Sequence, residues 1–111
     1  MSFHTQVWVH PFDDEPMNVD SARGTILKFL DEYALSHDVL SNLFEACGSV
    51  FATSTLFYLD STAIIMLFDK LAQCLPHATF AVKGSGEDPR DIWTREYADG
   101  VVTFEAGPFH G

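Results

Sequence analysis

The chain has 111 residues, of which 47% are hydrophobic, and its 16 acidic residues against 6 lysines and arginines give a net charge of −10. This length predicts a single domain over residues 1–111 with one core, and the apolar content argues against disorder. The shortage of cations argues against direct binding to nucleic acid or to anionic membranes, because both depend on Lys and Arg. A protein partner with a basic surface remains compatible with this charge.

Residues 5–9 alternate in hydropathy and predict a strand with Val7 and Val9 on one face. A helix then follows that Asp20 or Ser21 can cap. Its predicted inward stripe, at spacings of three and four residues, consists of Ile26, Leu27, Leu30, Tyr33 and Ala34.

A second helical stretch begins at Ser36 and stops at Gly48. Its predicted buried residues are Val39, Leu40, Leu43, Phe44 and Cys47. The two stretches are either separate helices or one helix broken near Ser36. Residues 50–59 are rich in apolar, aromatic and β-branched side chains and predict a second strand. Asp60 can cap a third helix that runs to about Cys74 and has apolar residues around much of its circumference.

The last third of the chain predicts strands. Residues 79–83 form one short strand, and residues 92–97 and 101–105 form a hairpin around Asp99 and Gly100, because Asp-Gly favours a two-residue turn. The whole order predicts an α+β two-layer sandwich of the ferredoxin-like kind, with a mostly antiparallel sheet and helices on one face.

The segment LPHATFAVKGSGEDPRDIWTREYADGV, residues 75–101, resembles small ferredoxin-like accessory proteins of phages, plasmids and related mobile elements. The residues that carry the resemblance are Pro76, Phe80, Gly84, Gly86, Glu87, Asp91, Trp93, Tyr97 and Gly100. The resemblance covers about a quarter of the chain. It implies a setting in which small acidic proteins block host nucleic-acid machinery, as anti-restriction and anti-CRISPR proteins do.

No catalytic, cofactor-binding or metal site is predicted from the residues. The five histidines have no metal-ligand spacing, and His4 and His10 lie about 20 Å apart along one strand. The loop at residues 84–91 lacks the third glycine and the following helix of a dinucleotide site, and a local turn involving Asp91 is favoured instead. Cys47 and Cys74 are expected to be buried, reduced thiols.

Acidic residues are concentrated in the first 45 positions, where the only cations are Arg23 and Lys28. If these acids gather on one surface, they could imitate the phosphate path of a nucleic acid; the alternative is an ordinary hydrated helix surface. The predicted partner-binding residues are Asp13, Asp14, Glu15, Asp20, Asp31, Glu32, Asp38 and Glu45.

These observations favour a non-enzymatic protein that inhibits a basic, nucleic-acid-handling complex, of the anti-CRISPR or anti-restriction type. An immunity protein that neutralises a toxin nuclease is an alternative in the same class. A small ligand-binding or enzymatic domain, with a pocket on the open sheet face near Trp8, His10 and Trp93, is the alternative in another class. A homodimer through Ile65 and Met66 of the third helix is a further hypothesis. No signal peptide or membrane span is recognised, so the expected location is cytoplasmic.

Overall fold

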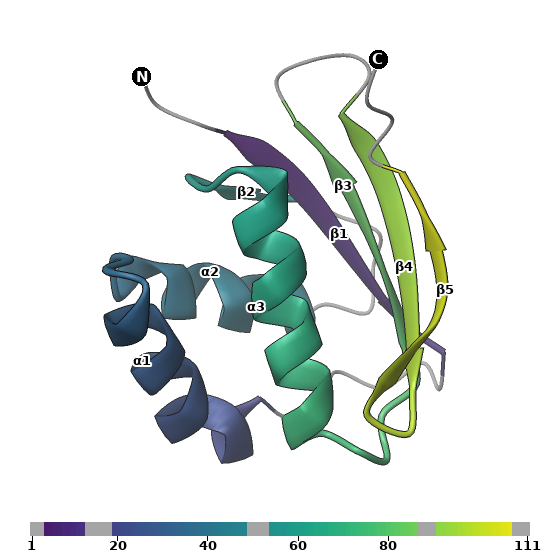
Figure 1. Ribbon diagram of the computed structural model, residues 1–111, viewed down its shortest axis with the longest axis horizontal. Coiled ribbons are helices and arrows are strands. Elements are labelled where there is room, and N and C mark those ends of the chain that lie inside the picture. The colour runs from purple at the N-terminus through teal and green to yellow at the C-terminus, as the bar shows by residue number, and fades with distance from the viewer. Residues whose placement is uncertain (1–3, 13–18, 49–53, 87–90, 108–111) are drawn as a thin grey trace.

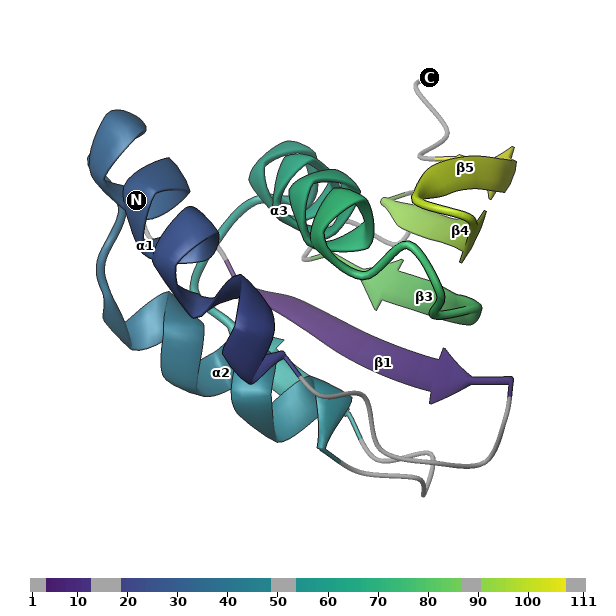
Figure 2. The same cartoon turned by 90° about the horizontal axis from the view of Figure 1, so that it is seen from below.

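The computed structural model describes residues 4–12, 19–48, 54–86 and 91–107. In this part of the chain, α-helices lie on one face of a five-stranded sheet, which makes an α+β sandwich in which two helices pack on the sheet and the first helix packs against them (Figure 1, Figure 2). The predicted class, with an antiparallel sheet and helices on one face, is confirmed. We call the sheet face toward the helices the inner face and the opposite one the outer face.

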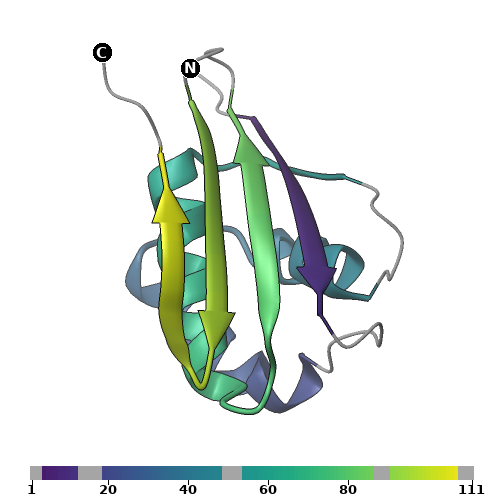
Figure 3. The ribbon, with the colours of Figure 1, turned by 90° about the vertical axis from the view of Figure 1, so that its right-hand side faces the viewer.

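The strands of the described residues are β1 (Thr5–Pro11), β2 (Thr55–Phe57), β3 (Phe80–Ser85), β4 (Ile92–Ala98) and β5 (Val101–Ala106). Their order across the sheet is β2-β1-β3-β4-β5, and every neighbouring pair is antiparallel. The two strands that flank β1 are joined through the helix α3 (Ser61–Cys74), so this connection crosses over β1. Figure 3 views the sheet from its outer face, and no helix stands in front of it.

The predicted hairpin between β4 and β5 is confirmed. Asp99 and Gly100 have φ angles of 54° and 79°, and positive φ at both central positions is what a type I′ turn requires. The prediction for the second strand was too long at its C-terminal end, because β2 ends at Phe57 and Asp60 already caps the next helix. The beginning of that prediction, residues 50–53, lies outside the described residues.

The two helical stretches in the first half are separate helices. A 3-10 turn, η1 (Asp20–Ala22), leads directly into α1 (Arg23–Glu32), and α2 (Asp38–Cys47) follows after a short connection. Tyr33 and Ala34 lie beyond the end of α1 and are exposed, so their prediction as inward residues was wrong. The physical reason is that the chain turns at Ala34, which has a φ of 54°, before the periodic pattern runs out.

The third helix, α3 (Ser61–Cys74), begins as predicted, because the Asp60 carboxylate accepts a hydrogen bond of 2.9 Å from the backbone N–H of Ala63. Its buried residues are Ser61, Ile64, Leu67, Phe68, Leu71 and Ala72. This is the largest buried set of the three helices, as expected. None of the helices in the described part of the chain is long and apolar enough to cross a bilayer.

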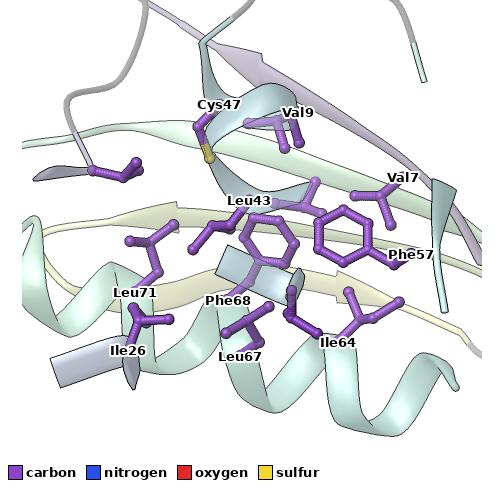
Figure 4. Packing of buried hydrophobic residues seen from close by; sticks show 14 of the residues in the cluster. Val7, Val9, Ile26, Leu43, Cys47, Phe57, Ile64, Leu67, Phe68 and Leu71 are labelled. Carbon is purple, nitrogen blue, oxygen red and sulfur yellow. The ribbon is translucent and has the colours of Figure 1, made fainter. Parts of the chain in front are cut away.

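The core lies between the inner face and the helices, and Figure 4 shows its side chains meeting there from both layers. Val7 of β1, Leu43 of α2 and Ile64 of α3 are fully buried. Phe57 and Phe68 contact each other with ring centroids 6.3 Å apart. Cys47 is also fully buried, and both cysteines are free, whereas Cys74 is only half-buried. The core between the layers is therefore apolar, and every helix contributes side chains to it.

Candidate interaction surfaces

The acidic residues predicted to bind a partner lie in the helical layer, as far as the structure describes them. Those described are Asp20, Asp31, Glu32, Asp38 and Glu45, and all five are exposed. Residues 13–15, which carry the other three, are outside the described residues. Segment 19–48 contains these five acids and two cations, so its net charge is −3. The helical layer is therefore acidic on its solvent side.

The turn between α1 and α2 brings several of these acids together. The backbone N–H of Leu35 donates to the carbonyl of Leu30 at 2.8 Å, and Ala34 takes the left-handed conformation that completes this type of helix end. His37 Nε2 then lies 2.7 Å from Asp31 Oδ1. This contact joins the end of α1 to the start of α2.

Four of the exposed acids lie on α1 and α2, and we call them the acidic corner: Asp31, Glu32, Asp38 and Glu45. Asp38 and Glu45 are seven residues apart on the exposed side of α2, which corresponds to two turns and about 10 Å. Within the described residues, no ion pair involves Glu32, Asp38 or Glu45. Their carboxylates are available to a basic partner.

Asp20 belongs to a different environment at the start of α1. It forms an ion pair of 3.1 Å with Arg23, and the Arg23 guanidinium lies 5.1 Å from the centre of the Phe44 ring on α2. A cation therefore lies beside this acid. The described acids of the predicted set are thus divided between this ion pair and the acidic corner.

The outer face of the sheet is almost without charge. Among the described strand residues that point outward, only Lys83 of β3 and Glu96 of β4 carry a full charge. Exposed apolar side chains occupy much of the remainder, and they include Leu56 of β2, Ile92 of β4 and Phe104 of β5. The acidic surplus and the apolar surface thus lie on opposite sides of the molecule.

A shallow hollow of about 380 Å³ lies on the outer face. Its lining consists of Trp8, His10, Ala81 and Lys83, and the Lys83 ammonium is 5.8 Å from the centre of the Trp8 ring. The hollow exists because the side chain of Ala81 is small. The sequence placed Trp8 and His10 beside a pocket correctly, but Trp93 does not belong to it. Trp93 is buried on the inner face, because it pairs with Gly84, and Gly84 pairs with the buried Val7.

A polar network between α3 and the sheet was not foreseen from the sequence. The hydroxyl of Tyr97 donates to Asp69 Oδ1 at 2.6 Å, and Arg95 reaches both Asp69 at 3.4 Å and Glu105 at 2.9 Å. Burial and the hydrogen bond to Asp69 raise the pKa of Tyr97 well above its usual range. Burial disfavours the charge of Arg95, but the Tyr97 hydroxyl and the two carboxylates outweigh it, so its pKa is raised too. Both groups keep their protons, and the network acts as a link between the layers.

A second hollow, of about 210 Å³, lies between α1 and α3. It is lined by Phe29, Glu32, Tyr33, Met66, Asp69, Lys70 and Gln73. Met66 is 37% exposed and Ile65 is half-buried, so the surplus apolar residues of α3 lie at the surface or the margin of the core. This mixed surface contains one cation and two acids and has no group arranged for catalysis.

The described histidines do not gather around a common centre. The His4 ring packs edge-on against Tyr58, the His10 ring does the same against Phe12, and His37 contacts Asp31. In the described segments, no three His, Cys, Asp or Glu side chains are grouped closely enough to hold a metal ion. Burial raises the pKa of the Cys47 thiol to about 12, which disfavours the reactive thiolate.

Four of the residues on which the predicted resemblance rests pack in two pairs on the neighbouring strands β3 and β4. Trp93 covers Gly84 so closely that a methyl group there would overlap the indole, and Tyr97 stacks on Phe80 with ring centroids 5.0 Å apart. The Asp91 carboxylate accepts a hydrogen bond of 2.9 Å from the Ser61 hydroxyl, and the Asp91 carbonyl accepts one of 2.8 Å from the backbone N–H of Gly86, while residues 87–90 of the predicted turn lie outside the described residues. Packing in the core therefore explains Phe80, Gly84, Trp93 and Tyr97.

Comparisons of the chain with known protein families, with curated proteins and with solved structures find no match. The acidic corner and the outer face are therefore the features of the molecule that indicate a function.

Proposed function

We propose that the protein is a non-enzymatic binding protein of the cytoplasm, and that its acidic corner occupies a basic site on a larger nucleic-acid-handling complex. It would act as an inhibitor of the anti-CRISPR or anti-restriction type. The observation that carries this proposal is that Glu32, Asp38 and Glu45 are exposed on two consecutive helices and lie outside any ion pair of the described residues.

The physical basis is electrostatic complementarity. A site that binds nucleic acid presents several Lys and Arg side chains, and exposed carboxylates on a rigid support can engage them in place of phosphates. The acidic corner lies on two helices whose inner sides are buried in the core, so its spacing is set by the fold. Opposite charges also accelerate encounter and orient the partners. The same surface supports the related proposal of an immunity protein against a toxin nuclease.

The test is a binding measurement with purified CRISPR effector complexes, restriction enzymes and toxin nucleases at low and at high salt. We expect association that weakens with salt and is reduced on the order of tenfold, mainly through a slower on-rate, when Glu32→Gln and Asp38→Asn are combined. The matched control combines Asp99→Asn and Glu105→Gln on the β4–β5 hairpin, which removes the same charge elsewhere. Equal weakening by both pairs, or no complex at low salt, would argue against the acidic corner.

The hollow on the outer face favours a second candidate, a small ligand-binding domain. Its volume of about 380 Å³ falls at the lower end of the range of ligand pockets. Thermal unfolding measured in the presence of metabolites and metal ions tests it, since a ligand of the native state raises the midpoint.

A ferredoxin-like relationship is supported by the two layers and the antiparallel sheet. The element order β-α-α-β-α-β-β-β departs from the β-α-β-β-α-β order of that motif, so we propose only a relationship of architecture.

A further inference from the structure

The outer face has a regular arrangement of side chains that the strand register defines. One row across the sheet contains His10, Ala81 and Glu96, and the next contains Trp8, Lys83 and Thr94. The hollow therefore lies over Ala81 in the first row. Lys83, the longest side chain of the centre, stands two residues along the same strand, about 7 Å away. A long cationic side chain, whose ammonium lies beside Trp8 in a single copy, and a hollow thus lie side by side on the central strand β3.

We propose that a second copy of the chain covers this face and forms a two-fold symmetric dimer. A two-fold axis that runs across the strands and passes between Ala81 and Lys83 places Lys83 of each copy over Ala81 of the partner copy. The lysine then enters the partner's hollow. It also comes within one strand spacing, about 4.8 Å, of the position of the partner's Glu96, because Glu96 is next to Ala81 in the register.

Charge complementarity favours a second copy over other occupants. A strongly basic or acidic partner would meet one lysine and one glutamate on this face, which cancel each other. In the symmetric dimer, Lys83 of each copy lies near Glu96 of the partner copy. The pair therefore forms twice, as an isologous interface requires. The acidic corners belong to the helical layer on the far side, so they point away from the contact and their repulsion is small over that distance.

The available area is sufficient for association of moderate strength. Five strands about 4.8 Å apart, each with about six residues at 3.4 Å, give a flat footprint of roughly 500 Å² per copy. Side-chain relief adds to this, and a standard interface buries about 800 Å² per partner. A dimer with a dissociation constant in the micromolar range fits an interface at this lower end. The inference does not depend on the proposed function, because the acidic corner stays exposed in both states.

Sedimentation velocity of the full chain, from low micromolar to several hundred micromolar, tests the proposal. We expect a monomer that becomes a dimer as concentration rises. Lys83→Glu places a carboxylate beside the partner's Glu96 and is expected to weaken association at least on the order of tenfold. Combining Lys83→Glu with Glu96→Lys reverses the pair and is expected to restore the dimer. Lys28→Glu makes the same charge change on α1 and is expected to leave association as it was.

Circular dichroism melts verify that each variant is folded before it is compared. The restored double variant separates a broken contact from a broken fold. A chain that stays monomeric at every concentration overturns the proposal, and so does a dimer that Lys83→Glu leaves intact and Met66→Glu dissociates, since that places the contact on α3. Failure of the double variant to restore association likewise overturns the pairing of Lys83 with Glu96.

Discussion

The inner and outer faces of the sheet differ in what their side chains contact. On the inner face, Trp93 closes over Gly84 and Tyr97 stacks on Phe80, so each residue is fitted to a neighbour in the core. On the outer face, Ile92 and the side chains around it face solvent with no second layer over them. The residues of the inner face thus contribute to the stability of the fold, whereas those of the outer face are available for binding.

The largest expected effect comes from filling the close contact on the inner face. Gly84→Ala puts a methyl group where the Trp93 indole lies, and Trp93 is 1% exposed and has little room to move. We expect a loss of about 3 kcal/mol in the free energy of unfolding, measured by urea denaturation. Ser85→Ala, one residue along and pointing outward, is expected to change it by less than about 0.5 kcal/mol. Equal effects of the two variants would mean that the faces do not differ as described.

This contrast shows where sequence reasoning succeeds and where it stops. Alternation identified β4 and the side chains that share a face, and the Asp-Gly turn identified the hairpin, because these are local signals. Alternation cannot say whether Trp93 shares a face with Trp8, since the two residues are 85 positions apart in the sequence and only the pairing through β3 aligns their strands. The prediction of the pocket was therefore correct for Trp8 and His10 and wrong for Trp93.

The polar network of Asp69, Arg95 and Tyr97 and the C-terminal end of α1 were not predicted, for related reasons. Asp69 and Tyr97 are 28 residues apart and meet only when α3 packs on the sheet. Tyr33 continues a helical pattern of apolar residues, but the turn at Ala34 has already ended the helix. The acids of the corner were named correctly as exposed, yet their grouping depends on the same turn.

A second prediction concerns the most deeply buried ionisable group, Cys47. Its pKa is about 12 in the folded chain against 9.0 when exposed, so the unfolded chain loses the proton first. The contribution of this thiol to the free energy of unfolding is therefore fully present below pH 9. It falls by roughly 1 kcal/mol per pH unit as the pH rises toward 12. Cys47→Ala should flatten that loss in denaturation curves measured between pH 9 and 11. Cys74→Ala, which removes the half-buried thiol, should leave the loss in place.

A third prediction tests the link between the layers. Tyr97→Phe deletes the hydroxyl that donates to Asp69 at 2.6 Å and leaves the ring stacked on Phe80. We expect a loss of about 1.5 kcal/mol, because a hydrogen bond to a charged group is removed from a part-buried position. Thr103→Val deletes an exposed hydroxyl that donates to the Glu96 carbonyl at 3.2 Å, and it should cost less than about 0.5 kcal/mol. Thermal unfolding of both variants measures the difference.

The smallest effect concerns the turn that supports the acidic corner. Ala34 has a φ of 54°, a conformation that costs a residue with a β-carbon roughly 1 kcal/mol and costs glycine little. Ala34→Gly should therefore stabilise the chain by about 0.5–1 kcal/mol despite the greater freedom of glycine when unfolded. Ala63→Gly, inside α3, should destabilise it by about 1 kcal/mol and is the matched control. If both variants destabilise equally, Ala34 does not hold the left-handed conformation, and the grouping of Asp31, Glu32 and Asp38 loses its support.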